Sequence, residues 1–125
     1  MILGVRTRRQ LRGSHAEGDA VHYLAGLGWQ VLARNVKVGR DEIDVLALDP
    51  GPPTELVCVE VRSASSPAFG TPEERVDRAK VGHLYRAMRE VATDVRAPRR
   101  VDLVIVDRRR ASTPIIRHLR RLEPP

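Results

Sequence analysis

Two segments with a strand-like pattern stand on either side of a short run of turn-forming residues. Glu42–Leu48 and Glu55–Arg62 are rich in β-branched and apolar residues with polar residues interspersed, which is typical of strands. The segment between them, Asp49–Thr54 (DPGPPT), is dense in Pro and Gly. A connection this short favours an antiparallel hairpin. If the turn centres near Pro52, each residue of the first strand faces the residue of the second strand that is the same number of positions from Pro52.

This register places two acids opposite each other on one face of the sheet. The predicted opposed pairs, all even-numbered, are Leu48–Leu56, Leu46–Cys58, Asp44–Glu60 and Glu42–Arg62. Opposed Cβ atoms lie about 5 Å apart, which is close enough for two carboxylates to hold one ion. Opposed acids repel each other unless a cation lies between them or one is protonated. The alternative is that Arg62 forms cross-strand ion pairs with Glu42 and Asp44 on a solvated face. A slip of one residue would move these side chains to the other face.

The segments around the hairpin predict two helices and two further strands. Ser14–Leu27 has an apolar stripe at helical spacing, formed by Ala16, Ala20, Leu24 and Leu27. A second helix opens at Thr71–Glu74, and one of its faces continues through Val76, Lys80, Leu84, Met88 and Val91. The expected strands are Trp29–Val36 and Val101–Val106, and residues 114–122 fit either a strand or a helical turn. This order predicts an α/β domain with a mixed sheet.

The charge of the chain favours a polyanionic partner. The net charge is +6, and all but two of the 22 basic residues are Arg. Residues 1–12 form a basic arm that contains Arg8, Arg9 and Arg12. Such an excess attracts nucleic acid largely without sequence preference, although a merely solvated basic surface is the alternative. No apolar run approaches the roughly 18 residues that span a bilayer, and no secretory signal is visible, so we expect a cytoplasmic protein without a membrane partner.

Other kinds of site find little support in the sequence. The single cysteine, Cys58, excludes an internal disulfide and a multi-cysteine zinc site. The four histidines show no metal-ligand spacing, and the four aromatic residues are too few for a base-stacking platform. Glu17 has two interpretations, because Ser14-His15-Ala16-Glu17 also matches a capping box in which Glu17 reaches back to the helix start.

Several separated motifs resemble the YraN-like family of bacterial proteins. In chain order they are Ala16-Glu17, Arg34-Asn35, Glu42-Ile43-Asp44, Val59-Glu60-Val61-Arg62, Phe69-Gly70, Lys80 and Arg100-Val101-Asp102. The fold of this family is similar to that of restriction endonucleases and Holliday-junction resolvases. The resemblance therefore implies a single three-layer α/β domain over residues 13–125, with a central mixed sheet flanked by helices.

The resemblance also implies a PD-(D/E)xK-type site. Asp44 and Glu60 would hold Mg²⁺ or Mn²⁺, with the backbone carbonyl of Val61 as a further ligand and Glu17 as the helix acid near the metal. Arg62 stands where the family usually has Lys, and we expect it to take part in catalysis. Ala16 and Asp41 stand where glycines are usual. Glu42 matches a family position of open role, and the residues predicted to contact nucleic acid are Lys80, Arg8, Arg9, Arg12 and Arg40.

Because Arg62 replaces the expected Lys, the sequence leaves open whether the protein is an active enzyme. Arg keeps the positive charge but does not lose its proton in proteins, so it cannot serve as a general base. The first hypothesis is a metal-dependent endonuclease acting on DNA, including branched or repair intermediates. The alternative is a nuclease-fold protein that binds nucleic acid with weakened or no turnover. A protein-interaction module with an acidic partner is a third hypothesis. By analogy with resolvases, a homodimer is expected.

Overall fold

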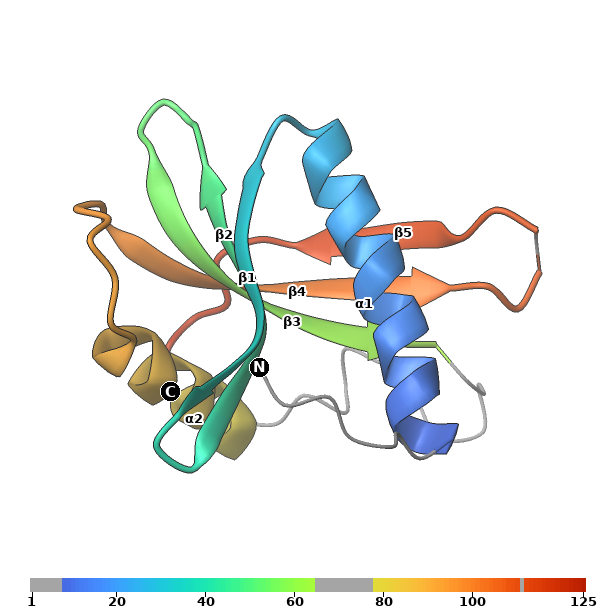
Figure 1. Cartoon of the computed structure of the whole chain (residues 1–125), viewed down its shortest axis with the longest axis horizontal. Helices are drawn as coiled ribbons and strands as arrows, with labels where there is room; N and C mark the ends of the chain where they lie inside the picture. The colour runs from blue at the N-terminus through green and yellow to red at the C-terminus, as the bar shows by residue number, and fades with distance from the viewer. Residues whose placement is uncertain (1–7, 65–77, 111) are drawn as a thin grey trace.

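The computed structural model describes residues 8–64, 78–110 and 112–125, with side chains from His15 onward. The elements, labelled in Figure 1, are α1 (Arg8–Gly26), β1 (Gln30–Val38), β2 (Asp41–Asp49), β3 (Glu55–Ser63), α2 (Arg78–Glu90), β4 (Arg99–Asp107) and β5 (Ile115–Leu119). Each of the four expected strands is present within about two residues of its predicted bounds. The segment that fitted either a strand or a helical turn contains the strand β5.

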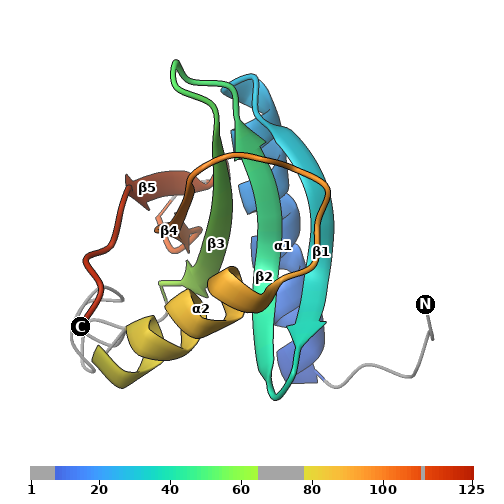
Figure 2. The ribbon, with the colours of Figure 1, turned by 90° about the vertical axis from the view of Figure 1, so that its left-hand side faces the viewer.

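Within these residues, five strands form one sheet in the order β1-β2-β3-β4-β5. The pair β3–β4 is parallel and the other three pairs are antiparallel. Parallel neighbours need a crossover connection, and α2 lies in the one between β3 and β4. Figure 2 shows α1 and α2 on opposite faces of the sheet. The predicted three-layer α/β architecture with a mixed sheet is confirmed, and it is compatible with a restriction-endonuclease-like fold.

Each face of the sheet has its own apolar core. On one face, Ala16, Ala20 and Leu24 of α1 pack with Val57 and other odd-numbered strand residues. On the other face, the predicted stripe of α2 packs on even-numbered residues of the hairpin; this cluster contains Leu84, Met88 and Val91 together with Leu46, Leu56 and Cys58. Removal of this apolar surface from water is what holds both helices on the sheet.

The helix α1 differs from its predicted bounds at both ends. It begins at Arg8 and not at Ser14, so the second half of the segment predicted as an arm is helical. Arg, Gln and Leu are good helix formers, and their propensity extends the helix past the capping signal. At the other end the helix stops at Gly26, and Gly28 takes a left-handed φ of 86°. Leu27 therefore leaves the stripe and is 41% exposed, which corrects its assignment to the core.

The hairpin register is the predicted one as far as the ladder extends, whereas the predicted pairs Asp44–Glu60 and Glu42–Arg62 lie beyond its last regular pair. Leu48 pairs with Leu56 and Leu46 pairs with Cys58, and the ladder runs from Asp49–Glu55 to Val45–Val59. The turn formers at residues 50–54 thus set the pairing without a slip. The predicted start of the second helix, Thr71–Glu74, lies outside the described residues.

Candidate metal and nucleic-acid site

The two acids predicted to face each other meet where the β2–β3 ladder ends. Val45–Val59 is the last regular pair, and Asp44 and Glu60 occupy the next position on each strand. There the Asp44 carboxylate takes the place of a backbone acceptor, because the amide N–H of Val61 donates to its Oδ2 atom at 2.8 Å. This bond holds the Asp44 side chain against β3, beside Glu60.

The alternation of β2 breaks at Asp44. Ile43 packs in the core beneath α2, whereas Val45 packs in the core beneath α1, although a regular strand would place both on one face. The neighbouring strand is irregular at the same level, since Asn35 has a left-handed φ of 53° between the pairs Arg34–Val45 and Val36–Ile43. Asn is one of the few residues that adopt this conformation readily. The irregularity turns Asp44 from the ladder toward the acid on β3.

The environment of Asp44 disfavours its charged form. Burial, and then contact with the Glu60 carboxyl, raise the pKa of Asp44 to about 8, against an ordinary value of 3.8. The bond from Val61 and the positive charge of Lys80 act in the opposite direction but do not outweigh these causes. A perturbed acid beside a second acid is a common sign of a functional site.

Two cations approach Glu60 without fully compensating the acids. Lys80 Nζ lies 3.4 Å from Glu60 Oε2, and Arg62 Nε lies 3.8 Å from Glu60 Oε1. Glu60 is 5% exposed, and its Oε2 atom has no hydrogen-bond partner among the described residues. The cross-strand pairs of Arg62 with Glu42 and Asp44 do not form in the described part of the chain. The alternative of a simple ion-paired solvated face is therefore wrong.

Glu17 approaches the same region from α1. Because Ser14 lies inside the helix, Glu17 is not a capping residue, and that interpretation is excluded. Burial and the negative charge of Asp44 raise the pKa of Glu17, while a hydrogen bond from Asn35 and the charge of Arg34 lower it. Arg34 Nη2 lies 3.7 Å from Glu17 Oε2. Arg34 and Asn35 had no predicted role in the site, although the motif Arg34-Asn35 in the family resemblance was an available signal.

The donor set suits a hard divalent cation. No group of three or more His, Cys, Asp and Glu side chains gathers to hold a metal in the described part of the chain. Mg²⁺, however, is commonly held by one or two carboxylates together with water and substrate phosphate. The buried Glu60 Oε2 atom without a hydrogen bond, and the raised pKa of Asp44, are both conflicts that a cation would relieve. Asp44 and Glu60 thus fit the predicted ion, and the Val61 carbonyl stays a predicted ligand.

The structure describes the other predicted site residues to different extents. Arg40 is exposed in the turn between β1 and β2, and Glu42 is exposed on β2, where its backbone pairs with Lys37. Arg8, Arg9 and Arg12 belong to the first turns of α1, and their side chains lie outside the described set. Their predicted contact with nucleic acid stays a prediction.

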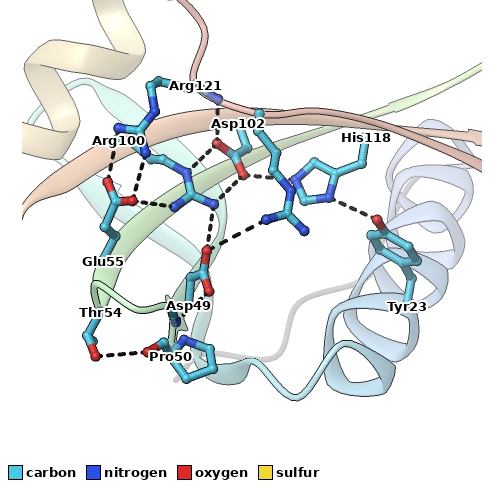
Figure 3. A network of polar contacts seen from close by, with 11 residues as sticks. Tyr23, Asp49, Pro50, Thr54, Glu55, Arg100, Asp102, His118 and Arg121 are labelled. Atoms are coloured by element: carbon cyan, nitrogen blue, oxygen red, sulfur yellow. Dashed lines mark hydrogen bonds and ion pairs between the residues drawn. The ribbon is translucent and has the colours of Figure 1, made fainter.

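A second charged network lies at the far end of the hairpin and has a different character (Figure 3). The buried Arg100 guanidinium contacts Asp102 at 2.9 Å, Glu55 at 3.0 Å and Asp49 at 3.0 Å. Arg121 adds a contact of 2.7 Å to Glu55. Every acid of this network therefore has a close cationic partner.

The same network joins α1 to β5. His118 Nε2 lies 2.8 Å from Asp102 Oδ2, and the other ring nitrogen lies 2.9 Å from the hydroxyl of Tyr23. Burial acts to raise the pKa of Asp102, but hydrogen bonds with His118 and Arg100 hold it below its ordinary value. Because the acids Asp102 and Glu55 are closely paired with Arg100, His118 and Arg121, we interpret the network as structural.

The fold and the site define the chain as a three-layer α/β protein with a buried pair of acids at an irregular point of a mixed sheet. Its sequence belongs to UPF0102, described as "Uncharacterised protein family UPF0102", whose family model matches residues 16–106. The YraN-like resemblance seen in the sequence is the same family, and it is thereby confirmed. No helix in the described ranges is both long and apolar enough to cross a membrane.

Relatives of this family match most or part of the chain. A UPF0102 protein of Arthrobacter sp. (strain FB24) is 37% identical over 90% of this chain and 95% of its own length. One from Pseudarthrobacter chlorophenolicus is 36% identical over 90% and 85%, respectively. A UPF0102 protein of Persephonella marina is 42% identical over 61% of this chain and 63% of its own length. The matched family region includes both acids of the pair.

Proposed function

We propose that this protein is a cytoplasmic, metal-dependent endonuclease that hydrolyses phosphodiester bonds in DNA. The observation that carries the proposal is that the carboxyl groups of Asp44 and Glu60 lie side by side, largely shielded from solvent, next to Lys80 and Arg62. An arrangement of acids and cations at one point suits a ligand that brings both a divalent cation and phosphate. A net charge of +6 supports a polyanionic substrate.

The residues of the chain have separable roles in this proposal. Asp44, Glu60 and the Val61 carbonyl would hold Mg²⁺ or Mn²⁺. When bound, such an ion supplies charge neutralisation at the phosphate and lowers the pKa of water. The Val61 N–H fixes the direction of the Asp44 carboxylate. Arg62 holds phosphate oxygens, since an arginine side chain keeps its positive charge in proteins.

The test is cleavage of labelled linear, single-stranded and four-way-junction DNA in the presence of Mg²⁺ or Mn²⁺. We expect cleavage of at least one substrate, a loss of at least about 100-fold in Asp44→Asn and Glu60→Gln, and an unchanged rate in the exposed control Asp94→Asn. Cleavage that persists in both site variants would show that a contaminant or another site is responsible. The same assay with RNA substrates shows whether the protein acts on DNA or on RNA. Gel filtration of the protein bound to DNA tests the expected homodimer.

Arg62 supports a second candidate, a nuclease-fold protein that binds nucleic acid without turnover. In this case binding falls with salt and is indifferent to Mg²⁺. If Arg62→Lys cleaves DNA and the wild-type protein does not, the result would favour this candidate and indicate that the protein descends from an active nuclease. Metal-dependent cleavage by the wild-type protein would reject it.

A further inference from the structure

The cation closest to the acid pair comes from a helix and not from the strand. Lys80 Nζ on α2 lies 3.4 Å from Glu60 Oε2, whereas Arg62 Nε on β3 lies 3.8 Å from Glu60 Oε1. Lys80 therefore contacts the acid pair from an element other than the two strands that carry the acids.

The two cations differ in what they can do at this point. An ammonium group is a compact charge on a flexible stem, and its donors rotate to follow a moving acceptor. A guanidinium is a planar fork that suits two fixed oxygens. The Lys80 side chain is half-buried at the end of α2 nearest the acids, beside the buried Val81. The side chains of Lys80 and Arg62 are equally exposed, at 37% each, so the two cations differ in geometry and not in burial.

From these contacts we propose that Lys80, and not Arg62, is the catalytic cation of the site. This assignment rests on the proposed phosphodiester hydrolysis. Water adds its oxygen to phosphorus and loses a proton to solvent, the bond from phosphorus to one sugar oxygen breaks, and that oxygen takes a proton from solvent. The Lys80 ammonium group donates to the non-bridging phosphate oxygens on which negative charge develops. Such a preorganised charge stabilises the transition state more than the bound substrate.

The proposal changes the role that the sequence suggested for two residues. Arg62 occupies the position at which the family resemblance leads us to expect Lys. An arginine there cannot act as a general base, which is why the sequence left catalysis open. If α2 supplies the ammonium, Arg62 is needed only to bind phosphate. Loss of Arg62 then raises KM, while loss of Lys80 lowers kcat.

The experiment compares Lys80→Met and Arg62→Met with wild type, with Arg89→Met as the control for a lost charge on the exposed part of the same helix. We expect Lys80→Met to lower kcat by about 100- to 1,000-fold, as for removal of one preorganised donor, and Arg62→Met to lower kcat by less than about 10-fold. The double variant Lys80→Met/Arg62→Lys should recover part of the lost kcat, because it returns an ammonium to the same acids.

A second readout separates catalysis from folding and metal binding. Mn²⁺ titration by calorimetry should show equal or tighter binding in Lys80→Met, because a competing cation next to Glu60 has been removed. An unchanged kcat in Lys80→Met, or a larger loss in Arg62→Met, overturns the assignment while the nuclease proposal stands. If the wild-type protein binds Mn²⁺ but cuts no substrate, the nuclease proposal itself fails, and the assignment fails with it.

Discussion

Replacement of Asp44 by Asn should make the metal-free protein more stable. The raised pKa of Asp44 means that the folded protein holds this carboxyl in its neutral form, whereas the unfolded chain ionises near the ordinary value of 3.8. An acid with a raised folded pKa leaves stability intact below the unfolded pKa and reduces it as pH rises toward the folded pKa. The stability of the metal-free protein should therefore fall between about pH 4 and pH 8.

The size of this effect follows from the shift. At pH 7 the unfolded chain is about three pH units above its carboxyl pKa of 3.8 and has lost the proton that the folded protein keeps, and each unit corresponds to about 1.4 kcal/mol. The cost of folding with Asp44 is then on the order of 4 kcal/mol. Asn has nearly the same shape, accepts the bond from Val61 and can donate to Glu60. We expect Asp44→Asn to gain on the order of 2–4 kcal/mol at pH 7, after allowance for burial of the amide.

The assay is urea denaturation in EDTA at several values between pH 5 and pH 8. The wild-type free energy of unfolding should decline over this interval, and that of Asp44→Asn should decline less, so the gain grows with pH. Saturating Mn²⁺ should stabilise wild type and leave the variant nearly unchanged, since binding to the folded state shifts the unfolding equilibrium. A variant that is less stable than wild type at pH 8 without metal would refute the view that these acids are electrostatically strained.

Three further variants test the packing around the site. Arg100→Met should cost about 3–5 kcal/mol in urea denaturation, because Asp102 and its neighbouring acids lose their buried cation; a loss below about 1 kcal/mol would contradict their tight pairing. Tyr23→Phe removes the hydroxyl contact with His118 and should cost about 1 kcal/mol, with no change in DNA cleavage if the network is structural. Leu24→Ala should cost about 2–5 kcal/mol in thermal unfolding, because α1 loses a fully buried anchor, and a neutral result would mean that α1 is not held by this core.

The hairpin and its acid pair were predictable from local rules. Alternation determines which residues share a face, and the turn formers at Pro52 and its neighbours determine the register. Together these two rules place Asp44 opposite Glu60. The apolar stripes of both helices likewise follow from a period of 3.6 residues. These features depend on residues close together in the chain, which is why they can be predicted from the sequence.

Other parts of the site depend on contacts between distant segments. Asp44 turns toward β3 where Asn35, on the adjacent strand, adopts a left-handed backbone conformation. The two-residue alternation of a strand cannot predict such an irregularity. The approach of Lys80 depends on how the crossover returns α2 to the sheet. The strand β5 contains Arg117 and His118 among apolar residues, so its pattern is weak, and pairing with β4 decides its conformation.

The two acid clusters of this sheet show that the strain at Asp44 is not a general property of the fold. Around Arg100, three carboxylates contact one guanidinium at 2.9–3.0 Å, and Arg121 adds a further close contact to one of them. Burial of acids is thus fully compensated at one end of the hairpin. At the other end, the cations remain 3.4 and 3.8 Å from Glu60, and one buried oxygen lacks a hydrogen bond within the described chain. A chain with 20 arginines that compensates one cluster in this way leaves the other acid pair only partly compensated, at a point where a cation and phosphate would complete it. This is the physical reason to regard the pair as a binding site.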